Sequence, residues 1–365
     1  MPRDNTEARF TQSRTSSTLH DHKLSWKNNE RSSLLEMVWP RKPYMAIARK
    51  IAIRHLPPSA FGDATQISTF SEGAFHRLFL ISSPLTGEEF IFRVALPVDP
   101  FFKTESEVAT MDYVRLNSPV HVPRVIAYSF DASNELGFEW ILMEKVNGVQ
   151  LAKVEESMSV ESKICLAQQL ANVLRTLWAA HEFDLYGNLY YADIWNQVNH
   201  RPTTQPSKSS RALLDSGFVI GRIVNGTFFG GKRLLFPCNR GPFKTTAEFA
   251  AAEVEILSHA VHNIGPIPNT DYYCESDEAL AKNKTEVLST LERLSEAIQK
   301  IYSSPPANGD DVNVLRHEDM SSRNVLVDPE TYDLVSIIDW ESVSILPAWL
   351  TQDGVPYCLR GIEVE

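Results

Sequence analysis

Hydrophobic and polar positions alternate along the first third of the chain, which is the pattern of half-buried strands. The alternation is clearest at residues 66–70, 76–82 and 89–94. The last two runs are joined by S-P-L-T-G-E, which is rich in residues that favour turns. We therefore predict three strands here, the second and third of which form a hairpin.

A helical period follows, and then the strand pattern returns. Val108 and Met111 lie at helical spacing within residues 103–116, and acidic residues occupy the first turn, as the start of a helix prefers. Residues 123–130 and 139–144 again alternate like strands. The first half of the chain thus predicts three strands, a helix and two further strands.

After residue 146 the pattern becomes mainly helical. Two apolar stripes recur every three or four residues, and we interpret both as faces turned toward the core. A Ser- and Thr-rich stretch at 203–210 between them predicts a flexible insertion. The first stripe is Ala167, Ala171, Leu174 and Trp178, and the second is Val287, Leu291, Leu294, Ile298 and Ile301.

The segment before the first strands is different in character. Residues 1–32 are rich in Ser, Thr, Arg and Asn and predict a disordered or flexible segment. Its arginines favour a mitochondrial targeting peptide, whereas its acidic residues argue against one, so we expect a cytoplasmic protein with a mitochondrial alternative. Residues 33–60 predict a helical lead-in that two prolines interrupt.

Composition narrows the possible partners. The 365 residues carry a net charge of −11, which argues against a nucleic-acid-binding surface. No apolar run is long enough to span a membrane. The four cysteines form no C-x-x-C pair and are expected to be reduced thiols.

The clearest candidate chemistry lies near the C-terminus, in R-H-E-D-M-S-S-R-N at residues 316–324. Two short apolar runs follow, at 324–327 and 334–338, and the turn sequence D-P-E-T-Y-D between them predicts a hairpin that ends at Asp339. Phosphoryl transfer requires a carboxylate beside the acceptor hydroxyl and oxygen ligands for metal ions. Asp319 could act on the hydroxyl, while Asn324 and Asp339 could hold the metal.

Other motifs are weaker. His317 is expected to hydrogen-bond the backbone rather than carry a proton. G-T-F-F-G-G-K-R ends in Arg233 where a phosphate-binding P-loop needs Ser or Thr. His259, His262 and Cys274 fit no standard zinc spacing, so we expect solvated histidines. The hydrolase motif G-x-S-x-G and the dinucleotide-binding motif G-x-G-x-x-G are both missing.

The catalytic segment H-E-D-M-S-S-R-N-V-L-V-D and the later S-I-I-D-W-E resemble the aminoglycoside phosphotransferase family, which includes choline-kinase-like members. The I-D-W form, in place of the D-F-G of protein kinases, favours the small-molecule branch. Several further segments look most like a fungal branch of the family whose substrates are unassigned. The resemblance covers roughly residues 60–345.

The resemblance implies roles for residues farther upstream. F-S-E-G-A-F-H-R resembles a nucleotide-covering hairpin with only one glycine. F-I-F-R-V-A-L-P places an arginine where many kinases have a phosphate-binding lysine, and K-T-E-S-E-V-A-T resembles the helix whose glutamate pairs with that cation. E-W-I-L-M-E-K-V-N-G resembles the hinge that binds adenine. The residues concerned are Ser71 and Gly73, Arg93, Glu107 (or Glu105), and Glu144, Lys145 and Val146.

The implied fold is the bilobal protein-kinase-like α+β fold, with an N-terminal lobe at 33–146 and a helical C-terminal lobe at 147–365. The implied activity is transfer of phosphate from ATP, with Mg²⁺, to a hydroxyl of an unknown small molecule. The alternatives are an inactive pseudokinase that acts as a nucleotide-binding or interaction module, and a protein kinase. Relatives usually continue well beyond the metal-binding aspartate, but only 26 residues follow Asp339. We therefore expect residues 181–275 to form the acceptor site, or the sequence to be shortened.

Overall fold

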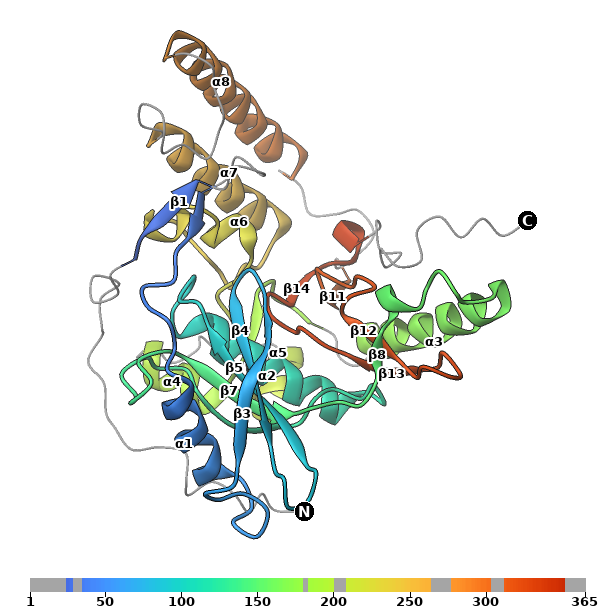
Figure 1. Ribbon diagram of the computed structural model, residues 1–365. Coiled ribbons are helices and arrows are strands. Elements are labelled where there is room, and N and C mark those ends of the chain that lie inside the picture. Colours follow the sequence, from blue (N-terminus) through green and yellow to red (C-terminus); the bar gives the residue numbers. More distant parts are fainter. Residues whose placement is uncertain are drawn as a thin grey trace.

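The computed structural model describes residues 24–28, 35–179, 183–199, 208–263, 277–302 and 312–351. Its N-terminal part is a five-stranded antiparallel sheet in the order β3-β4-β5-β7-β6 (Figure 1). All five strands predicted from alternation are confirmed, with ends that differ slightly. They are β3 (Gln66–Glu72), β4 (His76–Ser82), β5 (Glu89–Ala95), β6 (Val125–Ser129) and β7 (Trp140–Glu144).

The two faces of this sheet pack against different helices. Phe92 and Leu142 point to one face, where they join the apolar cluster of helix α1 (Met45–His55). Their neighbours Ile91 and Ile141 point to the other face and pack in the cluster that contains helix α2 (Phe102–Asn117). Successive side chains of a strand point to opposite faces, so both faces of β5 and β7 are covered.

Helix α2 lies between the sheet and the C-terminal half of the protein. It contacts β6 and β7 on one side and β9 (Asn188–Tyr191) on the other. Every residue from Lys103 to Met111 is buried, including Glu105 and Glu107. Polar groups are buried only where they find partners, so this helix is the place to look for a site between the two halves.

The C-terminal half is mainly helical, with three small antiparallel sheets. The sheets are β9 with β10 (Phe218–Gly221), β11 (Asn313–Arg316) with β14 (Ser344–Pro347), and β8 (Val149–Gln150) with β12 (Val325–Val327) and β13 (Leu334–Ile337). A sheet-rich N-terminal lobe followed by this helical lobe is the kinase-like α+β fold. The helices are α3 (Val160–Ala179), α4 (Ala192–Asn199), α5 (Lys208–Asp215), α6 (Gly226–Phe229), α7 (Thr246–His262) and α8 (Asp277–Ile301).

The hairpin expected after the motif is confirmed: β12 pairs with β13, with Val325 opposite Ile337. The link from β7 into the C-terminal lobe runs close beside it. A Cβ atom added at Gly148 would lie 3.3 Å from both the Leu326 side chain and the Val327 carbonyl oxygen. Glycine therefore lets the chain that leaves the sheet pass directly over the hairpin.

The lead-in differs from the prediction. Residues 35–37 are not helical but form strand β2 (Leu35–Met37), which pairs with β1 (Trp26–Asn28). Strand β1 also corrects the expectation of disorder for that part of residues 1–32. Helix α1 begins only after Pro43, because a proline inside a helix removes a backbone donor and clashes with the preceding turn.

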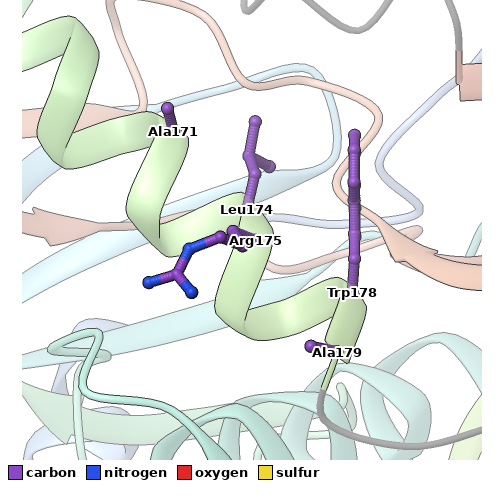
Figure 2. A pocket seen from close by; sticks show the side chains of 5 residues that line it. All are labelled: Ala171, Leu174, Arg175, Trp178 and Ala179. Carbon is purple, nitrogen blue, oxygen red and sulfur yellow. The ribbon is translucent and has the colours of Figure 1, made fainter.

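The predicted stripe on α3 lies at the edge of the core, where Leu174 and Trp178 pack against it. Ala171 is exposed, and Leu174 and Trp178 are half-buried on the rim of a shallow outer pocket (Figure 2). The apolar face of this helix is wider than one stripe. A second stripe, displaced by one residue, has the same spacing, and it is this stripe that lies in the core. The side chains in the core are Leu166, Leu170, Val173 and Leu177.

The second predicted stripe is also mostly outside the core. Helix α8 packs along α7 and projects from the rest of the protein (Figure 1). Of its five stripe residues only Ile298 is buried, while Leu294 is 46% and Ile301 is 70% exposed. Spacing predicted the helix correctly, but not which surface would cover it.

Two smaller points complete the fold. Residues 208–210 of the predicted insertion begin helix α5, and residues 203–207 lie outside the described part of the chain. Among the helices that the structure describes, none has the length and apolar character that a membrane span requires.

Candidate active site

The motif loop runs from the end of β11 to the start of β12. His317 is buried at its base, with Nε2 3.2 Å from the carbonyl oxygen of Ile338 and its ring packed edge-on against Trp340 at 5.1 Å. Burial lowers the pKa of His317, against the opposing influence of Asp339. His317 is therefore a neutral side chain that ties the loop to the end of the hairpin, as the sequence predicts.

Asp319 and Asn324 are held together within this loop. The side-chain amide of Asn324 donates to the Asp319 carboxylate at 2.9 Å and to the Asp319 backbone carbonyl at 2.9 Å. Asn324 is buried, while Asp319 is exposed. With its NH₂ group committed to Asp319, Asn324 has its amide oxygen left to offer as a ligand.

Strand pairing brings Asp339 to the same place. The backbone N–H of Ile338 donates to the carbonyl oxygen of Asn324 at 2.9 Å, so Asp339 follows directly beyond that pairing. Asp339 has φ of 64°, a left-handed conformation that is uncommon for a residue other than glycine. Such a conformation persists only when its surroundings enforce it, and here the Trp340 indole anchors the turn by donating to Ile337 at 2.8 Å.

Arg93 reaches this turn from the N-terminal sheet. Its guanidinium contacts Glu107 on α2, lies 2.7 Å from the Asp339 carboxylate and lies 3.3 Å from Glu341. Burial alone would lower the pKa of Arg93, but these three carboxylates raise it above its ordinary value. Arg93 is therefore a permanent buried cation at the junction of the lobes.

The structure also distinguishes between the two glutamates of α2. Glu107 contacts Arg93, whereas Glu105 accepts a hydrogen bond from the Tyr128 hydroxyl at 3.0 Å. The preferred assignment, Glu107, is the one that lies at the site. Burial raises the pKa of Glu107, and the Arg93 charge opposes that rise.

Three site residues were not anticipated from the sequence. His76, on β4, has Nε2 2.7 Å from the Glu341 carboxylate and 2.7 Å from Lys103 Nζ. Lys103 also forms an ion pair with Glu341. Burial and then the Arg93 charge lower the pKa of His76 to about 3, so its ring is neutral. The available signals were a lysine in the first turn of a helix and the glutamate of I-D-W-E.

The remaining predicted residues lie at the edges of the sheet. Ser71 is near the end of β3, and Gly73 follows in the turn before β4, where an added Cβ would meet nothing within 4 Å. Glu144 ends β7, and its N–H donates to the Arg124 carbonyl at 2.9 Å. Lys145 pairs with Glu89 at 2.9 Å. These contacts are local, and Val146 continues the same link toward β8.

The structure supports neither a phosphate-binding loop at the glycine-rich segment nor a zinc site at the histidines. The sequence from Gly226 forms the short helix α6, capped by Asn225, whose side chain accepts from the Thr227 N–H at 3.1 Å. Every strand pairing in the described residues is antiparallel, so no P-loop context surrounds it. His259 and His262 lie partly exposed on α7, and Cys274 lies outside the described residues.

Comparison with known proteins finds a family likeness in part of the chain. Residues 66–214 match the model of the phosphotransferase enzyme family. This segment of the chain is similar to that family. The matched segment begins at β3 and ends in α5, so it includes Arg93 and Glu107. The loop with Asp319 and Asn324 lies beyond the matched segment.

Two fungal relatives extend the likeness. One is a subtelomeric hrmA-associated cluster protein of Aspergillus fumigatus, 27% identical over 325 residues, which are 80% of this chain and 60% of the relative. The other is altered inheritance of mitochondria protein 9, mitochondrial, of Candida albicans, 27% identical over 312 residues, which are 78% of this chain and 48% of the relative. The chain thus spans roughly half of the length of these relatives.

Among solved structures, the chain is similar to a thermostable mutant of aminoglycoside phosphotransferase APH(4)-Ia, in ternary complex with AMP-PNP and hygromycin B. It is 16% identical, with a TM-score of 0.41, and the alignment covers 84% of this chain and 78% of that one.

Proposed function

We propose that this protein transfers the γ-phosphoryl group of ATP to a hydroxyl group of a small molecule. The observation that carries the proposal is the contact between Arg93 and Asp339, whose side chains lie 2.7 Å apart across the two lobes. A cation from the sheet and a carboxylate from the hairpin thereby meet at one point. Phosphoryl transfer uses both, because phosphate oxygens need positive charge and the metal needs oxygen ligands.

Arg93 binds the α- and β-phosphates in this proposal, and Glu107 keeps its guanidinium oriented. An arginine can hold two phosphate oxygens at once, so the replacement of the usual lysine preserves the role. The open space at Gly73 supports a phosphate-covering role for the turn that follows Ser71, and the backbone of Glu144, Lys145 and Val146 receives the adenine.

Asp319 acts on the acceptor. Its exposed carboxylate, fixed by Asn324, orients the hydroxyl and accepts its proton. The hydroxyl oxygen forms a bond to the γ-phosphorus as the bond from that phosphorus to the bridging oxygen breaks, and ADP leaves with the electron pair of the broken bond. Most of the catalysis then comes from position and charge rather than from covalent participation of the protein.

The donor set fits Mg²⁺. Asn324 has its amide oxygen free for a ligand role, and Asp339 supplies a carboxylate oxygen next to the cation that would hold the phosphates. Both are the hard oxygen donors that Mg²⁺ prefers. When bound, the metal would neutralise charge on the β- and γ-phosphates.

Nucleotide binding is the first test. We expect Mg-ATP to raise the thermal unfolding temperature of the unaltered protein, and Asp339→Ala to lose most of that increase. The matched control is Glu330→Ala, which removes an exposed carboxylate from the hairpin turn and should retain the full increase. If Mg-ATP does not shift the unaltered protein, the pseudokinase alternative, as an interaction module without nucleotide, is favoured instead.

Transfer is the second test. Incubation with [γ-³²P]ATP and separate pools of metabolites and proteins should label a small molecule in the metabolite pool. Label that appears only in protein would favour the protein-kinase alternative. Label in neither pool, despite nucleotide binding, would support a nucleotide-binding module without turnover.

The cellular location of the protein is a further part of the proposal. We keep the cytoplasm as the expected location, and the mitochondrial name of the Candida albicans relative supports the alternative. Import of the full chain into isolated mitochondria, with protection from added protease, would decide for the alternative.

A further inference from the structure

Lys103 occupies a position that is unfavourable for a lysine in two respects. It is the second residue of α2, where the positive end of the helix dipole disfavours a cation. It is also only 2% exposed, and lysine is almost never buried this deeply unless it is paired. A residue that is locally unfavourable on both counts points to a role at a site.

The partner of Lys103 comes from the other lobe. Its ammonium group forms an ion pair with Glu341, which lies two residues beyond Asp339. The neutral ring of His76 completes the group, 2.7 Å from Lys103 and 2.7 Å from Glu341. The pair therefore connects the start of α2 to the same turn that holds the metal ligand.

Helix geometry links this pair to the phosphate-binding cation. Lys103 and Glu107 are four residues apart, so they lie on one face of α2. That face makes two ionic contacts, Glu107 with Arg93 and Lys103 with Glu341. Arg93 in turn touches both Asp339 and Glu341, so these five charged groups form one connected network.

The same atoms do not make a good metal site. Ligand atoms of His76, Glu107 and Glu341 lie within 4.8 Å of one another. However, Arg93 and Lys103 already contact these groups, and two buried cations would repel a divalent ion placed among them. The cluster is balanced by the protein's own charges.

The fold has other means of joining α2 to the C-terminal lobe. Ser106 accepts a hydrogen bond from the Asn188 side chain at 3.1 Å, and Asp112 accepts one from the Tyr191 hydroxyl. Both ties lie farther along the helix. A buried ion pair adds little net stability over well-packed apolar residues, so the Lys103–Glu341 pair needs another reason.

We propose that Lys103 and Glu341 are positioning residues of the phosphotransferase site. Their ion pair fixes the turn of Asp339 against α2 and so sets the separation between the metal ligand and Arg93. Neither residue touches nucleotide or acceptor. This inference rests on the proposed function, since it concerns the geometry in which that site binds Mg-ATP.

The test removes both charges at once. Lys103→Met with Glu341→Gln leaves no unpaired buried charge, whereas either single change does. The matched control is Asp112→Asn with Tyr191→Phe, which removes one of the two other polar ties between α2 and the C-terminal lobe. The measurements are the unfolding temperature without ligand, the Mg²⁺ concentration for half-maximal ATP binding, and separate KM and kcat values.

We expect both double variants to remain folded. The Lys103/Glu341 variant should need at least tenfold more Mg²⁺ for half-maximal ATP binding and should lose kcat, while the control keeps the parental Mg²⁺ requirement. Parental Mg²⁺ dependence in the Lys103/Glu341 variant would overturn this inference alone. If the unaltered protein bound no Mg-ATP, the proposed function would fall, and the inference with it.

A second variant keeps the test informative if the double variant does not fold. Glu341→Asp retains the charge and the partner but shortens the side chain by one methylene, which draws the turn out of position. It should fold, and its Mg²⁺ requirement should rise in the same direction. A parental Mg²⁺ requirement for Glu341→Asp would contradict the positioning role.

Discussion

Glu139 offers a prediction whose sign and size follow from the structure. It is 5% exposed, and its carboxylate accepts a hydrogen bond at 2.6 Å from the N–H of Phe101, immediately before α2. Burial, opposed by hydrogen bonds from Thr104 and Phe101, raises the pKa of Glu139 to about 7, against 4.5 for an ordinary glutamate. The acid that caps the site helix is therefore protonated in the folded protein at mildly acidic pH.

Between about pH 4.5 and pH 7 the folded protein retains this proton while the unfolded chain releases it, so the free energy of unfolding falls as the pH rises. Above pH 7 both states are ionised and the loss is complete. A difference of about 2.5 pKa units corresponds to about 3 kcal/mol, an upper value for this group.

Glu139→Gln removes this titration while it keeps an oxygen to accept from Phe101. At each pH, the free energy of unfolding of the variant is compared with that of the unaltered protein. This difference should be about 3 kcal/mol more favourable to the variant at pH 8 than at pH 4.5. Urea denaturation at the two pH values measures the difference, and other titrating groups cancel because they are common to both proteins. Glu330→Gln, at an exposed site, is the control and should show the same difference from the unaltered protein at both pH values. An equal gain or loss for Glu139→Gln at pH 4.5 and pH 8 would refute the assignment of a buried proton to this carboxyl.

Three further predictions concern the site and the core. Asp319→Asn should leave Mg-ATP binding within about twofold of the parent while kcat falls by about 10² or more, measured by single-turnover transfer, because the lost carboxylate acts on the acceptor. Arg93→Met should weaken ATP binding by about tenfold or more in titration calorimetry and lower the unfolding temperature, because three carboxylates lose their shared cation. Leu170→Ala should cost about 2–5 kcal/mol in urea denaturation, since the side chain is fully buried, whereas Leu174→Ala on the outer pocket should cost less.

The N-terminal sheet and the closing hairpin could be predicted because their signals are local. Alternation at 76–82 and 89–94 reports two faces that the sheet buries differently, and the turn residues between them fix the register. The same holds for β12 and β13, whose pairing depends on a short turn. The lead-in failed because residues 35–37 pair with β1, a three-residue strand inside the segment that we expected to be disordered, and strands this short leave little pattern in the sequence.

The sequence predicted less well which face of each helix is buried. On α3 two apolar stripes compete, and only the position of the surrounding strands selects the one that contains Leu170. On α8 the spacing is regular, yet Leu294 and Ile301 are exposed because α7 is the one described element that packs closely along this helix. Periodicity shows that a helix has an apolar face, but the surface that covers this face is a property of the whole fold.

The site shows the same division between local and distant information. Asp319, Asn324 and Asp339 lie on one loop and one hairpin, so motif spacing was enough to bring them together. Arg93 and Glu107 could be placed only by resemblance to a family. Lys103, His76 and Glu341 come from a helix, a strand and a turn, and their local signs are limited to a lysine in the first turn of a helix and the glutamate of I-D-W-E.

The arrangement around Arg93 also constrains how the site would respond to nucleotide. Arg93 is shared among Glu107, Asp339 and Glu341, and Asp339 would have to exchange part of that contact for Mg²⁺. Lys103 remains beside Glu341 during such an exchange, so the turn does not lose all of its positive neighbours at once. A network with two cations can therefore release one carboxylate to a metal and still hold the lobes in register. A single cation could not contact the phosphate and the turn at the same time.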